Sequence, residues 1–157
     1  MTAQISVLFV CTGNICRSPL AEAAFRSEIV RRGVPALVDS AGTGAWHIGE
    51  PPDPRAQAVA RRYGIEIDAY RARQVVKADF QNFTHVIALD NSHLTTLRRL
   101  FPAGSKAHLS LLLDHVPGRA GQDVADPYYG PDAGFDRTWQ DVVEGAAALA
   151  RGLWGAA

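Results

Sequence analysis

Cys11 and Arg17 are separated by five residues in a segment whose composition favours phosphate chemistry. Residues 7–10 form an apolar run that predicts a buried strand, and a helix is predicted to begin near Ser18. If the loop between them curls, its backbone N–H groups and the first free amides of the helix form a cavity for a tetrahedral oxyanion. Arg17 can grip two phosphate oxygens at once. The same amides and guanidinium favour the thiolate form of Cys11, so the segment predicts a site that binds phosphate and attacks it.

The residues inside this loop suit a sharp curl. Glycine adopts conformations closed to other residues and asparagine tolerates the left-handed region, which predicts that Gly13 and Asn14 shape the turn. Ser18 is predicted to cap the helix, with Pro19 at its first position. The Walker pattern G-x-x-x-x-G-K-[ST] is absent from the sequence, which excludes that type of nucleotide loop. An inert buried cysteine before an ordinary turn is the simpler alternative, but it leaves the agreement of these choices unexplained.

Residues 7–22 resemble the signature of the bacterial type of low-molecular-weight protein tyrosine phosphatases. Residues 126–130, Asp-Pro-Tyr-Tyr-Gly, resemble the general-acid loop of that family, and residues 39–43 through 53–55 resemble its wall-forming segment. The resemblance extends over nearly the whole chain. It implies one phosphatase domain over residues 1–157, with no metal and no organic cofactor.

The resemblance also implies roles for individual side chains. Cys11 is expected to be the nucleophile, Arg17 the phosphate-binding group and Asp126 the general acid. Ser40 is expected to support the loop, together with Asn14 and Ser18. The Ser18 hydroxyl is also expected to donate to the Cys11 thiolate. The expected substrate-binding residues are Thr12, Gly13, Asn14, Ile15, Cys16, Ser18, Trp46, Tyr128 and Tyr129. Without the resemblance the roles of Asp126 and of the aromatic residues stay open, because an Asp-Pro pair often only begins a turn and single aromatic residues usually fill a core or a surface.

The two cysteines, Cys11 and Cys16, lie in one loop, which fits a reducing compartment better than a framework of structural disulfides. Cys16 has two interpretations. It is either a small buried apolar residue, or a thiol near enough in sequence to form a disulfide with an oxidised Cys11.

Composition limits the class of protein. The chain has 157 residues, of which 47% are hydrophobic and 20% are charged, and this suits one domain with its own core. Sixteen basic and sixteen acidic residues leave no overall field for nucleic acid or anionic lipid. No Lys or Arg precedes the N-terminal apolar run, which argues against a signal peptide or membrane span and predicts a cytoplasmic protein. The five histidines show no clustering with the cysteines typical of metal ligands.

Apolar periodicity predicts alternating strands and helices. Strands are expected over residues 5–10, 37–40, 85–89 and 107–111, and helices over 18–32, 54–64 and 92–100, followed by a C-terminal helix. Residues 42–52 are expected to form a surface loop and residues 112–133 a functional loop. The predicted fold is a single three-layer α/β domain. Its four-stranded parallel sheet has helices on both faces, and the phosphate loop follows the first strand, where ligands bind in such sheets.

These observations predict a phosphomonoesterase that acts through a cysteinyl-phosphate intermediate on phosphotyrosine in proteins. A tyrosine kinase acting on the same substrates is a candidate partner. Three alternatives stay open. An arsenate reductase of the same fold relays a disulfide through further cysteines, and the sequence has none. Protein-arginine phosphatases tend to carry a threonine where this chain has Ile15. A module that only binds phosphotyrosine would not need Cys11, Arg17 and Asp126 together.

Overall fold

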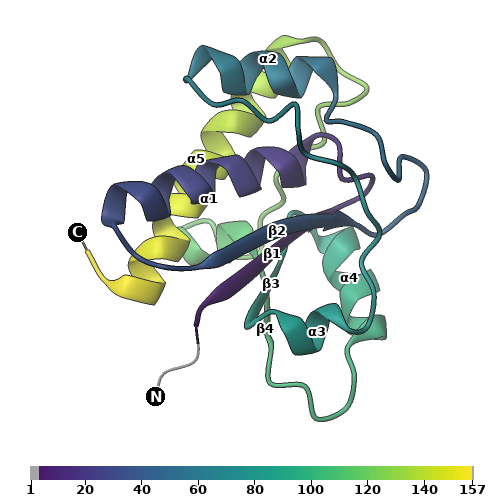
Figure 1. The fold of residues 1–157 in the computed structure, drawn as a ribbon, viewed down its shortest axis with the longest axis vertical. Helices are drawn as coiled ribbons and strands as arrows, with labels where there is room; N and C mark the ends of the chain where they lie inside the picture. Colours follow the sequence, from purple (N-terminus) through teal and green to yellow (C-terminus); the bar gives the residue numbers. More distant parts are fainter. Residues whose placement is uncertain (1–3, 157) are drawn as a thin grey trace.

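The computed structural model describes residues 4–156 and contains one four-stranded parallel sheet. Its strands stand in the order β2-β1-β3-β4 (Figure 1). Their bounds are β1 Ser6–Cys11, β2 Leu37–Gly42, β3 His85–Ala88 and β4 His108–Leu111. The predicted parallel sheet is therefore confirmed. β1 lies between β2 and β3, so the loop that follows it leaves from the centre of the sheet.

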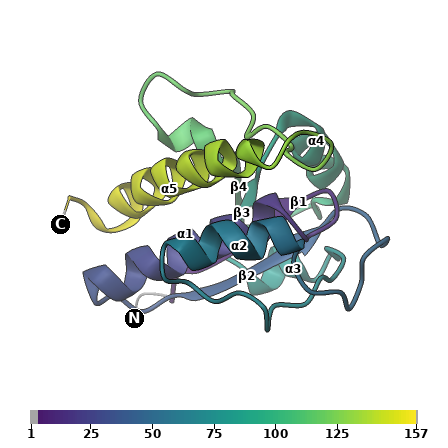
Figure 2. The same ribbon diagram turned by 90° about the horizontal axis from the view of Figure 1, so that it is seen from above.

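Helices cover both faces of the sheet, as predicted for three layers. They are α1 Arg17–Arg32, α2 Pro54–Arg62, α3 Asp79–Asn82, α4 Asn91–Leu100 and α5 Ala133–Trp154, with a short 3₁₀ helix η1 at Leu112–His115. Figure 1 shows α1, α2 and α5 on one side of the sheet and α3 and α4 on the other. From above, α1 and α5 lie side by side (Figure 2). No helix within residues 4–156 is long and apolar enough to cross a membrane.

The alternation of side chains along β1 fixes where Cys11 points. Successive strand residues face opposite sides of a sheet. Val7, Phe9 and Cys11 belong to the core beneath α1, α2 and α5, whereas Leu8 and Val10 belong to the core beneath α4. Cys11 is therefore the last residue of a fully buried strand and points toward the side from which α1 begins.

The structure corrects the predicted start of the first helix. The helix α1 begins at Arg17 with Cys16 as N-cap, and no side chain caps it. Ser18 is therefore a helical residue, and its hydroxyl bonds elsewhere. Pro19 stands at the third helical position, where its missing N–H still costs no intrahelical bond. At the start of α2 a side chain does cap the helix, since the Asp53 carboxylate accepts the Arg55 backbone N–H at 2.8 Å.

Candidate active site

A cavity of about 410 Å³ lies where β1 ends and α1 begins. It is lined by ten of the predicted site residues: Cys11, Thr12, Gly13, Ile15, Cys16, Arg17, Trp46, Asp126, Tyr128 and Tyr129. His47 lines it as well, and no motif in the sequence predicted this. Asn14, Ser18 and Ser40 do not line the cavity but lie behind it. A larger cavity of about 590 Å³, around residues 80–85 and 102–108, contains none of the predicted site residues.

The Cys11 sulfur lies at the base of this cavity with only 3% of the residue exposed. Its Sγ is 3.0 Å from Oγ of Ser18. A thiolate can only accept a hydrogen bond, so with Cys11 ionised the Ser18 hydroxyl is the donor. The Ser18 hydroxyl therefore does not cap the helix but lies where it can donate to a sulfur anion, which is the other position expected for it.

Asn14 organises the loop from behind. It adopts the left-handed conformation, with φ of 59°, as predicted. Its Nδ2 donates to Ser18 Oγ at 2.8 Å and to Ser40 Oγ at 2.9 Å, while its Oδ1 accepts the Arg73 backbone N–H at 3.0 Å. The Ser40 hydroxyl in turn donates to Glu22 at 2.7 Å. Burial raises the pKa of Glu22, against the hydrogen bonds from Ser40 and Arg26 that lower it.

The two glycines beside the loop are required for space. Gly13 has no positive φ, so the conformational role predicted for it is wrong. A Cβ on Gly13 would instead lie 2.8 Å from Cδ2 of His47, whose ring packs over the loop. At the end of β2, a Cβ on Gly42 would lie 2.7 Å from the Thr12 carbonyl oxygen. The backbone of the phosphate loop passes directly across β2 at that point.

Arg17 is held by two groups that were not predicted. Its Nη1 donates to Asp90 Oδ2 at 2.7 Å and to the Val124 carbonyl at 2.8 Å, and only 3% of Arg17 is exposed. Burial raises the pKa of Asp90, but hydrogen bonds from Ser92, the His93 backbone and Arg17 outweigh it and lower this pKa to about 2. Asp90 is therefore a fixed anion that anchors one end of the guanidinium.

His93 holds the other side of the same guanidinium. Its Nε2 is 2.8 Å from Thr12 Oγ1 and 3.3 Å from Arg17 Nη2. Arginine has no acceptor, so Nε2 must be the unprotonated nitrogen and the Thr12 hydroxyl donates to it. The proton of the neutral ring is then on Nδ1, which is 3.3 Å from Asp90 Oδ1 without the alignment of a hydrogen bond. Burial and the charge of Arg17 lower the pKa of His93 to about 4.

His93 is therefore expected to make the free energy of unfolding depend on pH. An unfolded chain protonates this histidine near pH 6.5, whereas the folded protein keeps it neutral down to about pH 4. Between these values the unfolded state binds the extra proton, so stability falls as the pH falls. His93→Asn should remove up to about 3 kcal/mol of this loss. Urea unfolding of both proteins at pH 7 and pH 4 measures the difference, and an identical loss in the two would contradict the assignment.

Asp126 lies at the cavity edge with its side chain 40% exposed. Its Oδ2 is 3.5 Å from Arg17 Nη2, and its Oδ1 accepts the Tyr128 backbone N–H at 3.0 Å. The segment before it is anchored, since the Val124 backbone donates to the Leu89 carbonyl at 2.8 Å. The carboxyl group of Asp126 and the guanidinium of Arg17 thus meet over the opening above Cys11.

Three aromatic side chains surround the opening. Trp46 is 74% exposed, Tyr128 37% and Tyr129 91%, and the two tyrosine rings meet edge to face with centroids 4.9 Å apart. Such exposure means that these rings are not filling a core, so each keeps exposed surface that can contact a ligand. The cavity therefore combines a polar base with an aromatic rim.

Cys16 is a free thiol and only 5% exposed. Burial, together with the negative charge of Asp53, raises the pKa of its thiol. Cys16 therefore stays protonated and does not supply a thiolate.

Peroxide should inactivate the protein by oxidising Cys11 to a sulfenic acid, which condenses with the Cys16 thiol to a disulfide and releases water. Thiol reductants should then restore activity. In Cys16→Ser the sulfenic acid has no partner, so the damage should become progressively irreversible. Activity recovered by dithiothreitol after graded peroxide exposure tests this. Equal recovery of the variant and the natural protein would leave Cys16 a role in packing only.

Comparisons with known proteins agree with this geometry. Residues 6–154 match the family model of the low molecular weight phosphotyrosine protein phosphatases. A Streptomyces coelicolor low molecular weight protein-tyrosine-phosphatase is 47% identical over 148 residues, which cover 91% of this chain and 90% of the relative. A Schizosaccharomyces pombe low molecular weight phosphotyrosine protein phosphatase is 44% identical over 147 residues, covering 92% and 94%. The crystal structure of YfkJ from Bacillus subtilis is 41% identical, with a TM-score of 0.89 and coverage of 97% and 96%.

The fold and the cavity define a cysteine-dependent phosphatase of the α/β class. The chain belongs to the low molecular weight phosphotyrosine protein phosphatase family, which confirms the resemblance found in the sequence.

Proposed function

We propose that this protein is a protein tyrosine phosphatase that hydrolyses phosphotyrosine, and aryl phosphates in general, through a phosphate ester of the Cys11 sulfur. One observation carries the proposal. The sulfur of the buried Cys11 is 3.0 Å from the Ser18 hydroxyl oxygen, within hydrogen-bond distance. It lies beneath an opening where Nη2 of Arg17 and Oδ2 of Asp126 are 3.5 Å apart. A nucleophile, a cation for the transferred phosphoryl group and a proton donor are thus present in one cavity.

In the first step Cys11 attacks phosphorus in line and the bond from phosphorus to the tyrosine oxygen breaks. Asp126 gives its proton to the departing phenolate. Nη1 of Arg17 is engaged by Asp90 and Val124, and one side of Nη2 contacts Thr12 and His93. Nε and the second N–H of Nη2 can then face two phosphate oxygens. The loop amides hold the remaining charge of the transition state. Because Asp90 and His93 fix the guanidinium before substrate arrives, little reorganisation is needed.

In the second step a water molecule attacks the thiophosphate. Asp126, now ionised, accepts a proton from this water, and the S–P bond breaks to release phosphate and the Cys11 thiolate. The Ser18 hydroxyl stabilises that thiolate as it reappears. Arg17 and the oriented amides supply positive charge of the kind that magnesium provides in kinases.

The aromatic rim supports phosphotyrosine as the substrate. Trp46 and Tyr128 can contact the two faces of a phenyl ring while its phosphate lies at the base of the cavity. Ile15, which lines the same cavity, offers no hydroxyl to a substrate. We further propose one domain over residues 1–157 that acts on phosphotyrosine proteins in the cytoplasm, where reducing conditions keep Cys11 and Cys16 as free thiols. A tyrosine kinase acting on the same proteins is its proposed counterpart.

Release of phosphate from a set of substrates in the presence of EDTA tests the proposal. The set contains peptides with phosphotyrosine, phosphoserine or phosphoarginine, together with para-nitrophenyl phosphate and, in a separate assay, arsenate with a thiol reductant. We expect hydrolysis of phosphotyrosine and para-nitrophenyl phosphate. Preference for phosphoarginine, reduction of arsenate without phosphatase activity, or binding of phosphotyrosine without turnover would each replace the proposal with one of the three alternatives.

A further inference from the structure

Arg55, in the first turn of α2, connects this helix to two neighbouring segments that come more than 70 positions later in the chain. Its Nε and Nη2 donate to the two carboxylate oxygens of Asp53, each at 3.1 Å. Its Nη2 also donates to the Tyr128 carbonyl at 3.0 Å. The guanidinium carbon lies 4.7 Å from the centroid of the buried Phe135 ring at the start of α5. Arg55 therefore joins α2, the loop that carries Asp126 and the first turn of α5.

The contact with Tyr128 leads directly to the general acid. The Tyr128 backbone N–H donates to Asp126 Oδ1 at 3.0 Å, while the Tyr128 carbonyl is bound by Arg55. The Arg55 guanidinium also lies over the Tyr128 ring, 5.5 Å from its centroid, at a distance where a cation and an aromatic face attract. Arg55 thus holds Tyr128 through the Tyr128 carbonyl group. The backbone N–H of Tyr128 in turn orients the Asp126 carboxylate.

The other end of this connection reaches the phosphate loop. The Asp53 backbone N–H donates to the Ile15 carbonyl at 2.8 Å, so the start of α2 is attached to the loop that surrounds Cys11. The Asp53 carboxylate is only 9% exposed. Burial raises the pKa of Asp53, but hydrogen bonds from Arg55 outweigh it and lower this pKa. The Asp53–Arg55 pair is therefore an ionised bridge between the nucleophile loop and the acid loop.

We infer that Arg55 is a positioning residue for the general acid: it fixes Tyr128, and through the Tyr128 backbone it sets the place of the Asp126 carboxylate relative to Cys11. This inference rests on the proposed function and extends it. Asp126 is at the surface, and within residues 4–156 the buried side chain that it pairs with is Arg17. Without Arg55 its loop would keep the anchor at Val124 but lose the one beyond Asp126. A displacement of about 1 Å is enough to impair proton transfer.

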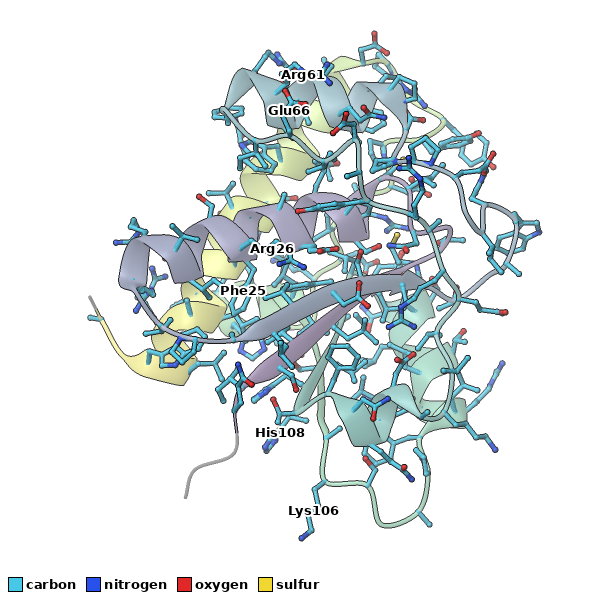
Figure 3. All side chains as sticks on the ribbon, in the orientation of Figure 1. Phe25, Arg26, Arg61, Glu66, Lys106 and His108 are labelled. Atoms are coloured by element: carbon cyan, nitrogen blue, oxygen red, sulfur yellow. The ribbon has the colours of Figure 1, made fainter. Side chains whose placement is uncertain are left out.

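The test compares Arg55→Met with Arg61→Met. Both arginines are on α2, and each pairs through two nitrogens with a carboxylate. Arg61 pairs with Glu66 on the surface (Figure 3) and contacts no part of the acid loop. Methionine preserves much of the length of the side chain over Phe135. Arg55→Lys is the second variant, since it keeps the charge and loses the fork.

The readout is the single-turnover rate of phosphoenzyme formation with phosphotyrosine and with an activated aryl phosphate. Phosphotyrosine has a poor leaving group that needs a proton, whereas an activated phenolate leaves with little help. We expect Arg55→Met to lower the phosphotyrosine rate about ten- to a hundredfold, with a smaller loss on the activated substrate. Arg55→Lys should lie between it and the natural protein, and Arg61→Met should leave both rates unchanged. Orthovanadate affinity should stay the same in Arg55→Met, as a check that the phosphate loop is intact.

A double mutant separates positioning from general damage. If Arg55 acts through Asp126, then adding Arg55→Met to Asp126→Asn should cost no more than about twofold, because the proton donor is already absent. Equal losses on both substrates, or full losses in the Asp126→Asn background, would overturn the inference. Failure of the proposed function looks different. The natural protein would be inactive, or the loss of rate caused by Asp126→Asn would be the same for every leaving group.

Discussion

Cys11→Ser is expected to abolish turnover of phosphotyrosine and para-nitrophenyl phosphate, with a loss on the order of 10⁴ or more, the scale seen when a covalent nucleophile is removed. The serine hydroxyl is not ionised at working pH, and the side chain that forms a hydrogen bond with the atom at this position is the Ser18 hydroxyl, which is not a base. The Ser18 hydroxyl that stabilises a thiolate at 3.0 Å would face a neutral oxygen instead.

The variant should keep the phosphate cavity, because Arg17 is held by Asp90 and Val124 and not by the sulfur. Binding of orthophosphate, measured by calorimetry, should therefore persist in Cys11→Ser. Steady-state activity close to that of the natural protein would show that another group attacks phosphorus.

Asp126→Asn is expected to slow phosphotyrosine cleavage by about 10²–10⁴, the range usual for a positioned proton donor. The loss should shrink as the leaving group becomes more acidic, since an acidic phenolate departs without a proton. Asparagine also keeps an oxygen that can accept the Tyr128 N–H, now 3.0 Å from Asp126 Oδ1, so the loop should retain its shape.

Rates of phosphoenzyme formation across phenyl phosphates of graded leaving-group pKa measure this dependence. In the variant the rate should fall more steeply with leaving-group pKa than in the natural protein. An equal slope would mean that the proton comes from another group. Asp123 is then the less suitable candidate, because its carboxylate is occupied by Asn91 at 2.7 and 2.8 Å, and Asp132 would be examined first.

The sheet and the nucleophile loop could be predicted because their signals are local. An apolar run, a left-handed Asn14 and a helix start are all contained in a dozen consecutive residues. The helix cap predicted for Ser18 shows where reasoning from a local pattern fails. A serine at a helix start is usually a cap, but here the sulfur of Cys11 and the amide of Asn14 engage its hydroxyl. The partner of the Ser18 hydroxyl depends on the position of Cys11, which is the last residue of β1. A local sequence pattern does not contain that position.

The groups that hold the site together could not be found from spacing. Asp90 and Arg17 are 73 positions apart in the chain, as are Arg55 and Tyr128. Asp90 did carry one usable signal. It comes two residues after the end of the strand β3, which lies beside β1, and side chains at the carboxyl ends of adjacent parallel strands meet at one edge. Once Asp90 is placed at the site, His93 can be placed there too. The Asp90 carboxylate caps α4 and accepts the His93 backbone N–H at 3.0 Å.

The most direct test of the account is capture of the phosphoenzyme. The protein is mixed rapidly with phosphotyrosine peptide, quenched in denaturant and examined by mass spectrometry of the intact chain and its fragments. We predict one added phosphoryl group per chain during turnover, located on the fragment that contains Cys11 and absent from Cys11→Ser. A phosphoryl group on any other residue, or rapid turnover with no phosphoenzyme formed even when its hydrolysis is slowed by Asp126→Asn, would contradict catalysis through Cys11.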